Sequence, residues 1–456
     1  ERVRLRFGLR PGSISFCGLK DKQGRTEQLI AVDGAEVDIQ EPDLRLKYLG
    51  RTDRPLTAAN TTSNRFSVSV RALTEEDLTR LPVSAAEVNR LGVVNYFDSQ
   101  RFGSLKHGQG FIAKDLIRGD FEAALHNFMA KPSPLDRSQD AQVKAFWRDH
   151  WGQWNKKPPM PGNAKYFRIL QALRARPGDF VNAFLQIDAN YRALLLFTYQ
   201  SYLWNEGVRR FLATILPRQA LFPMPYQAGT LLFHRDAPPE VLRELREMSF
   251  PLLAPDSHLD DPRVKAAVEW VLGKEKLTLG QLRIEEAPNL LFFRHEERPM
   301  LLYPHKLVLG RPARDELNRG FRKLNVSFTL PPGAYATLVI KRLFHFAWLE
   351  QDESEREEVA PPARFVASGA RPGSARDGNR RTAAEQRPRV QDGRESRAGE
   401  ERRKAIPPGR GAGGADAPST DKPGFREAQR RKKEARRRAR EASSQRRGPR
   451  PRQSNK

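Results

Sequence analysis

The sequence predicts an α+β protein that ends in a disordered, basic tail. Three observations support this prediction. Strand-like alternation of apolar and polar residues occurs near both ends of residues 1–349, and helical patterns dominate between them. After Leu349 the composition changes abruptly to Pro, Gly, Ala, Ser and Arg. With 456 residues, the chain has room for two or three domains.

The first elements are short. Residues 1–7 have the pattern of a helix that ends at Gly8, because glycine commonly follows the last helical residue. Residues 13–19 and 27–32 are expected to be strands, joined by the turn KDKQGR. Residues 64–73 alternate clearly between apolar and polar side chains, which indicates a strand with one buried face.

The later elements are longer, and the middle of the chain is mainly helical. The elements expected there are a helix at 84–91 closed by Gly92, loop and helix at 136–163, a long helix at 189–216, a strand at 229–234, helices at 238–248 and 262–273, and a strand, tight turn and helix at 326–349.

The charge of the chain points to a polyanionic partner. The formal net charge is +25 and the isoelectric point is about 10.4, so RNA or DNA is the first partner to consider. The charge is uneven. Residues 359–456 contain 28 basic and 11 acidic residues, a net charge of +17, and residues 1–358 carry the remaining +8.

The tail, residues 350–456, has too few apolar side chains to offset the entropy of ordering, so we expect it to be disordered. Its GRGAGG sequence, 409–414, fits a dinucleotide-binding pattern, but no predicted strand precedes it and we interpret it as a linker. Two roles remain open for the tail. Its arginines either raise RNA affinity and tether the protein to RNA, or keep the chain in solution.

Several classes of site are excluded by composition. The single cysteine, Cys17, rules out an internal disulfide and a multi-cysteine zinc site, which fits a reducing compartment and a cytoplasmic protein. We expect Cys17 to be a small buried residue. The eight histidines lack zinc-site spacing, and no apolar run approaches the roughly 18 residues of a membrane span.

Three segments carry a specific resemblance. They are GLKDKQGRTEQ (18–28), NYFDSQRFG (95–103) and LPPGAYATLVIKRL (330–343), and weaker segments lie at 201–211 and 298–307. Together, and in this order, they resemble the TruD family of tRNA pseudouridine synthases. The resemblance covers residues 1 to about 349.

The resemblance implies that Asp21 is the nucleophile. An ionised carboxylate can stabilise or trap the positive charge that develops at the sugar carbon when a glycosidic bond breaks. A cation such as Lys20 would hold the pKa of Asp21 down. Without the resemblance, a Lys-Asp pair in a turn is simply a solvated turn, and Lys20 could equally point outward. For Lys22 and Arg25 we expect phosphate contacts.

The target uridine lies in folded RNA and has to be flipped out and held. The resemblance implies that Asn95 and Tyr335 contact the substrate and that Phe97 packs against the base or Asp21. Family members often have Phe at the position of Tyr335. Without the resemblance, the stretch around Asn95 and Phe97 has the pattern of a core segment. We expect Tyr96 and Phe102 to be core residues.

The supporting residues are Gln28 and Arg101, which either orient the site or serve as ordinary hydrogen-bonded structural groups. Asn205 is expected to be structural, and Gly333 is expected to permit the turn that directs Tyr335. No metal, nucleotide or redox cofactor is expected.

The family architecture implies a catalytic domain with a central mixed sheet, formed by 1–115 and 298–349, and a mainly helical inserted domain at 116–297. The two domains are expected to form a positively charged cleft with Asp21 at its floor. The chain starts at Glu1 within a predicted helix, and the family has a strand-rich segment before this point. We therefore expect an upstream piece.

The function implied by the resemblance is isomerisation of a uridine, uridine 13 of tRNA, to pseudouridine. Two alternatives remain open: a non-catalytic RNA-binding protein that keeps the fold, and the same chemistry on other RNAs. We expect a monomer that binds tRNA and no membrane, although the sequence does not define the oligomeric state.

Overall fold

The fold is that of a computed structural model, which describes residues 1–20, 24–103, 110–133, 136, 138–158 and 163–346. All of these residues belong to one compact unit, Glu1–Phe365. Asp21 and Lys22, and the predicted tail at 350–456, lie outside the described residues.

The N-terminal segment begins with the expected short helix, α1 (Arg2–Arg6). Two short strands then pair antiparallel, β1 (Ile14–Phe16) with β2 (Ile30–Val32), with Ile14 opposite Val32. Both predicted strands are therefore present but shorter. A second small pair follows, β3 (Ile39–Gln40) with β4 (Arg45–Leu46).

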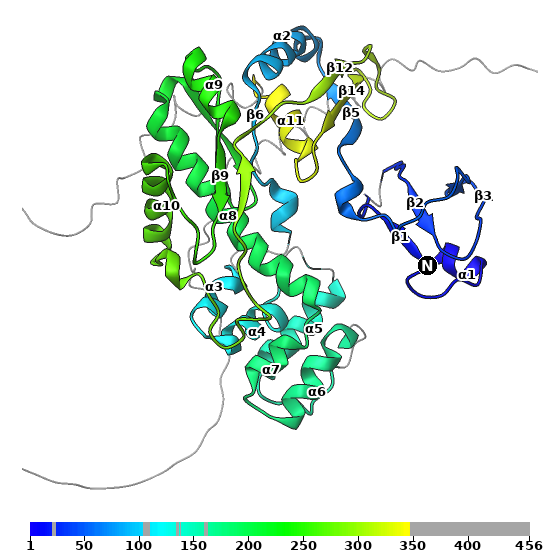
Figure 1. The fold of residues 1–456 in the computed structure, drawn as a ribbon, viewed down its shortest axis with the longest axis vertical. Helices are drawn as coiled ribbons and strands as arrows, with labels where there is room; N and C mark the ends of the chain where they lie inside the picture. The colour runs from blue at the N-terminus through cyan, green and yellow to red at the C-terminus, as the bar shows by residue number, and fades with distance from the viewer. Residues whose placement is uncertain (21–23, 104–109, 134–135, 137, 159–162, 347–456) are drawn as a thin grey trace, which may run out of the picture. The chain divides into compact units, whose positions relative to one another are not determined.

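The main sheet joins segments that are distant in the chain. Its central strand, β14 (Arg322–Leu330), pairs with β12 (His305–Leu309), β13 (Ala313–Arg314) and β5 (Asn64–Leu73). Figure 1 shows β5 beside β14, although about 250 residues separate them. The strand predicted at 64–73 is confirmed. Every strand pair that the structure describes is antiparallel.

Helix α2 (Glu75–Leu91) is longer than the predicted helix at 84–91. Pro82 lies inside it, and a proline usually interrupts a helix, which is why the sequence pattern suggested a later start. The capping box of Thr74 with Asp77 fixes the true start. Helix α11 (Ala336–Leu343) packs beside α2.

The middle of the chain is helical, as predicted. Its helices are α3 (Ile112–Ile117), α4 (Phe121–Met129), α5 (Ser138–Asp149), α6 (Phe167–Ala175), α7 (Phe180–Leu185), α8 (Ala189–Ile215), α9 (Pro239–Glu247) and α10 (Pro262–Glu275). Its strands are β7 (Leu221–Tyr226), β8 (Gly229–His234) and β9 (Ser249–Leu252). Strand β10 (Glu296–Pro299) pairs with β9, and β11 (Leu301–Leu302) pairs with β6 (Val93–Val94).

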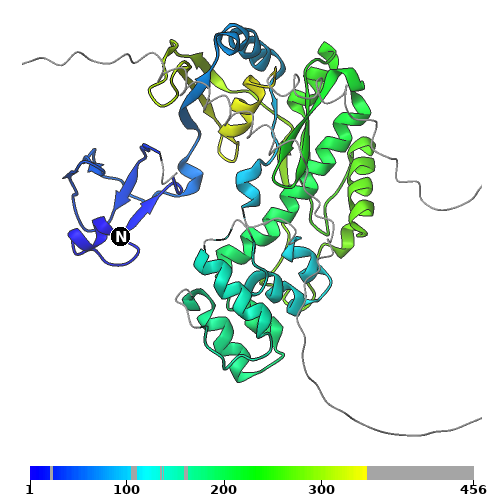
Figure 2. The ribbon, with the colours of Figure 1, turned by 180° about the vertical axis from the view of Figure 1, so that it is seen from behind.

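The longest helix, α8, organises the core. Figures 1 and 2 show α10 alongside it and the shorter helices gathered near its N-terminal end. Trp204 and Phe211 on α8 are fully buried, and burial of each large apolar side chain contributes about 1.5–3 kcal/mol. At Gly207 a Cβ would lie 2.7 Å from the Phe250 ring, so this glycine permits β9 to pack closely on the helix.

Candidate functional site: a basic cleft and an adjoining polar network

A cleft of about 3690 Å³ is lined by the three segments that carry the family resemblance. This volume is several times the roughly 300–1,000 Å³ of a typical small-molecule pocket, so it suits part of a polymer. Among the described lining residues eight are basic and three are acidic. The basic ones are Lys20, Arg25, Arg45, Lys47, Arg51, Arg65, Arg101 and Lys341. The cleft is therefore positively charged, which favours a polyanion.

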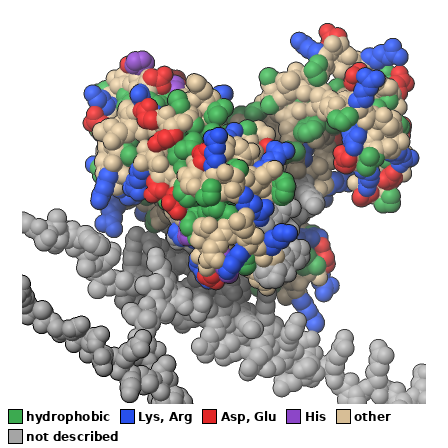
Figure 3. Space-filling model, turned by 90° about the horizontal axis from the view of Figure 1, so that it is seen from below, with side chains coloured by type: hydrophobic (Ala, Val, Ile, Leu, Met, Phe, Trp, Pro, Cys, Tyr) green, Lys and Arg blue, Asp and Glu red, His purple; other side chains and the backbone are tan. Residues whose placement is uncertain are grey.

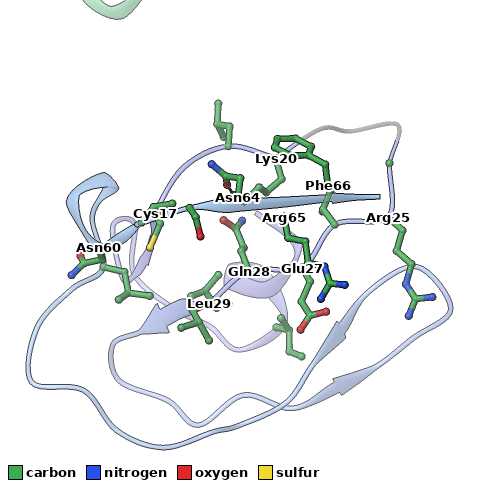
Figure 4. Close-up of a pocket in the computed structure, with 18 of the residues that line it drawn as sticks. Cys17, Lys20, Arg25, Glu27, Gln28, Leu29, Asn60, Asn64, Arg65 and Phe66 are labelled. Carbon is green, nitrogen blue, oxygen red and sulfur yellow. Dashed lines mark hydrogen bonds between the residues drawn. The ribbon is translucent and has the colours of Figure 1, made fainter. Parts of the chain in front are cut away.

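One wall is formed by the segment around β1 and β2. The ammonium of Lys20 donates a hydrogen bond to Asn64 Oδ1 at 2.8 Å, and Figure 4 shows these two side chains next to each other. Asp21, the predicted nucleophile, follows Lys20 directly but lies outside the described residues. An ammonium has three N–H donors, and among the described residues Asn64 is the hydrogen-bond partner of Lys20.

One prediction about this wall needs correction. Cys17 lines the cleft and is only partly buried, because the short β1 ends before it and leaves it at the cleft surface. Gln28 is exposed in the same wall and forms no hydrogen bond to another described residue, so it orients none of them. A role for Gln28 toward substrate or Asp21 stays a prediction.

Asn95 follows β6 and is 5% exposed. Its Nδ2 donates to the Pro299 carbonyl at 3.0 Å, and its Oδ1 accepts from Arg298 Nη2 at 2.7 Å. These two contacts fix the orientation of the amide, because an exchange of its oxygen and nitrogen would oppose donor to donor. One N–H and one oxygen lone pair of the amide remain unused by these contacts.

Arg298, on β10, is the site residue that the sequence did not indicate. Its Nε donates to the Asn95 carbonyl at 2.8 Å and its Nη2 to the Gly333 carbonyl at 3.2 Å. Its guanidinium lies 4.1 Å from the centroid of the Phe97 ring. Burial lowers the pKa of Arg298 to about 10, and the charge of Arg101 acts in the same direction. The only sequence signal was its place at the start of the weaker family segment 298–307.

Phe97 is buried, at 2% exposed, and packs edge-to-face against Tyr335 with ring centroids 6.1 Å apart. Asn205 on α8 holds the backbone of Phe97 with two hydrogen bonds, one to the Phe97 nitrogen at 2.9 Å and one to its carbonyl at 2.8 Å. The structural role expected of Asn205 is confirmed. Tyr96 and Phe102 are fully buried, as predicted.

Tyr335 lies at the start of α11 and lines the cleft. Its hydroxyl accepts a hydrogen bond from Arg101 Nε at 3.0 Å, and the Arg101 guanidinium lies 4.5 Å from the centroid of Phe197. Gly333 has a φ of +80°, a backbone conformation that residues other than glycine rarely adopt. It therefore permits the turn before Tyr335, as expected.

The structure therefore brings Asn95, Phe97, Arg101, Tyr335 and Arg298 into one contact network, in which Phe97 contacts Arg101, Tyr335 and Arg298. Of these residues, Arg101 and Tyr335 line the cleft. Lys20 and Gln28 share the cleft lining with Arg101 and Tyr335. The described residues contain no group of three or more His, Cys, Asp or Glu side chains that could hold a metal ion. Among them there is also no helix that is both long and apolar enough to cross a membrane.

Comparison with known proteins gives the class and then the family. The putative tRNA pseudouridine synthase D of Methanosarcina mazei has a crystal structure that matches with a TM-score of 0.58 at 24% sequence identity, over 75% of this chain and 84% of that one. The chain thus has a pseudouridine synthase fold. The α+β class is confirmed.

The family model described as tRNA pseudouridine synthase D (TruD) matches residues 1–343. The chain is 32% identical over 349 residues to the probable tRNA pseudouridine synthase D 2 of Methanocaldococcus jannaschii, covering 75% of this chain and 81% of that protein. It is also 32% identical to the tRNA pseudouridine synthase D of Aquifex aeolicus, covering 75% of this chain and 87% of that protein. The chain belongs to the TruD family of isomerases, so the resemblance seen in the three motifs is confirmed.

Proposed function

We propose that this protein converts uridine 13 of tRNA to pseudouridine, with Asp21 as the nucleophile. The observation that carries the proposal is the convergence of three chain-remote family motifs on one basic cleft. Lys20, Arg101 and Tyr335, one from each motif, all line it. Residues 1–115 and 298–349 form the catalytic domain in this proposal, and residues 116–297 form the insertion.

The reaction is an isomerisation and needs no oxidant or reductant. The bond between uracil N1 and sugar C1′ breaks with its electron pair on the base, and the Asp21 carboxylate stabilises or bonds to C1′. The base turns and C5 bonds to C1′, which displaces the Asp21 carboxylate if it has bonded there. The C5 proton is then released while N1 gains one. The net positive charge of the cleft favours the ionised form of Asp21.

The other site residues bind and position the flipped nucleotide. Tyr335 presents an aromatic ring in the cleft on which a base can stack. Asn95 keeps one donor and one acceptor, which match a uracil edge or a ribose hydroxyl. Phe97 supports the Tyr335 ring from the buried side, and Arg25 at the cleft surface suits a phosphate.

The test is Asp21→Asn in the full chain, with Asp33→Asn as the matched control because Asp33 is exposed and follows the same hairpin. We expect Asp21→Asn to abolish tritium release from C5-labelled tRNA while RNA binding and the melting temperature change little. The control should retain wild-type release.

Near-normal release by Asp21→Asn would disprove the assignment of the nucleophile. Absence of release by the wild-type chain on any tRNA would favour a non-catalytic RNA-binding protein. Release from other RNAs but not from tRNA would place the same chemistry on a different substrate. Mapping the modified uridine identifies the position.

A further inference from the structure

The helical region contains a long stretch without acidic residues. From Trp151 to Gly178, 28 residues include six Lys or Arg and no Asp or Glu. Residues 1–358 as a whole contain 52 basic and 44 acidic residues, so a stretch of this length without an acidic residue is distinctive. A one-sided run of cations on a folded surface creates a local positive potential.

Helix α6 has one buried and one exposed face. Ile169, Leu170 and Leu173 are buried, whereas Phe167 and Arg168 are exposed. Phe167 is 61% exposed, which is unusual for a phenylalanine beside an available core. The exposed face therefore combines an aromatic ring with a cation.

Two more exposed cations, Lys156 and Lys157, lie in the preceding segment, which is hydrogen-bonded to this helix. Arg174 of α6 donates from Nε to the Trp154 carbonyl at 2.8 Å, which fixes the segment carrying Lys156 and Lys157 beside the helix. No carboxylate of the described residues forms an ion pair with Lys156, Lys157 or Arg168. By contrast, Lys165 and Arg176 do have carboxylate partners. We call Lys156, Lys157, Phe167 and Arg168 the α6 surface.

The α6 surface is connected to the cleft through packed aromatic rings. The ring of Tyr166, next to Phe167, lies 5.6 Å from that of Phe128, which lies 5.7 Å from the ring of Tyr191. Tyr191 lines the cleft. Figure 3 views the molecule from the end where α6 lies and shows Lys and Arg side chains bordering hydrophobic ones there.

We propose that the α6 surface binds the sugar–phosphate backbone of the RNA substrate at a point separate from the target nucleotide. The ammonium and guanidinium groups contact phosphates, and Phe167 stacks on an unpaired base or packs on a ribose. This rests on the proposed function for the identity of the RNA. The consequence is that the chain recognises folded tRNA in preference to a short fragment.

The test is the triple variant Lys156→Gln, Lys157→Gln, Arg168→Gln in the full chain, with tRNA affinity measured from low to moderate salt. Loss of three phosphate contacts should weaken binding about tenfold or more and lower the slope of log K against log salt by roughly 2–3. The matched control is Arg218→Gln, Arg243→Gln, Lys265→Gln, three exposed cations on η4 (Arg218–Ala220), α9 and α10. The control should keep the wild-type slope.

A second substrate separates this proposal from the proposed function. On a short hairpin that carries the target uridine, the triple variant and the wild type should bind equally, because the hairpin does not reach the α6 surface. If the triple variant and the control variant have the same tRNA affinity and salt slope, the proposal is wrong. That is the result expected if the α6 surface binds an acidic protein instead of RNA. If the salt slope of tRNA binding changes as expected but no pseudouridine forms, the α6 surface binds RNA and the proposed function is wrong.

Discussion

Arg298 joins three backbone segments that are far apart in the chain. It donates to the Asn95 side chain and carbonyl, donates to the Gly333 carbonyl, and covers the Phe97 ring. Its charge is partly buried, and no carboxylate of the described residues pairs with it. A guanidinium suits this task because its planar fork can direct several donors at once. Arg298 is therefore a positioning residue for the amide of Asn95.

Arg298→Lys should separate catalysis from simple packing. Lysine keeps the charge but cannot reproduce the fork, so Asn95 loses its fixed orientation. We expect kcat to fall about 10- to 100-fold with little change in KM, because small misplacements of a positioning group act mainly on the reacting geometry. The free energy of unfolding should fall by about 1–3 kcal/mol.

The control for this prediction is Arg294→Lys, an exposed arginine four residues earlier that lies over Phe292. It should leave both constants unchanged. If Arg298→Lys lowers stability but not kcat, Arg298 serves the fold alone.

Residues inside the three main motifs could be predicted from the sequence, whereas Arg298, at the start of the weaker segment 298–307, was not singled out. Asn95, Arg101 and Tyr335 lie in family segments, and the structure places all three in one network. Arg298 acts across 203 residues of sequence through contacts to backbone carbonyls, and such contacts leave no pattern in the sequence. A substrate-contacting role for Asn95 implied little loss of stability on its replacement by alanine. Its buried hydrogen bonds indicate a cost of about 1–3 kcal/mol instead.

Strand β8 contains a buried histidine with a consequence for pH. His234 Nε2 lies 3.0 Å from the Leu91 carbonyl, so this nitrogen carries the proton, and Nδ1 has no partner among the described residues. Burial lowers the pKa of His234 to about 4. The unfolded chain therefore takes up a proton near pH 6.5, whereas the folded chain does so only near pH 4. Stability must fall as the pH drops between these values.

His234→Gln should reduce this pH dependence, because glutamine can keep the donor to Leu91 and does not titrate. Between pH 6.5 and 4.5 we expect the slope of unfolding free energy against pH to fall by about 1.4 kcal/mol per unit. Urea unfolding at several pH values measures it. His305→Gln, at an exposed histidine, is the control and should leave the slope unchanged. An equal slope for wild type and His234→Gln would contradict the prediction.

Elements with strong periodicity were predictable, and those fixed by distant contacts were not. The alternation at 64–73 correctly predicted β5, and the apolar face at 189–216 correctly predicted α8. The first turns of α2 are hard to predict because Pro82 lies inside the helix, where proline is normally disfavoured. Strands β10 and β11 were missed because their partners lie far away in sequence and they are too short for a period to show.

Charge is the property of the whole molecule that sequence totals describe best. The lining of the cleft, the α6 surface and residues 359–456 are all basic. Long-range attraction of RNA depends on the sum of these charges, whereas the position of the RNA depends on where they lie. The total charge predicted a nucleic-acid partner, but only the folded structure shows where the cleft lies.

Deletion of residues 359–456 tests what the tail contributes. If its net charge of +17 contacts RNA, the truncated chain should bind tRNA more weakly and with a shallower slope of log K against log salt. Affinity measurements across a salt series on both chains decide this. An unchanged slope would mean that the tail serves solubility and not RNA binding.

Helix α8 is one continuous helix that runs from the cleft into the rest of the helical region. Tyr191 and Leu194 near its start line the cleft, and Asn205 further along holds the backbone of Phe97. The proposed insertion, 116–297, therefore cannot be treated as a removable attachment. Replacing it with a short linker to obtain a minimal catalyst would remove α8, and with it the Asn205 side chain that holds the backbone of Phe97.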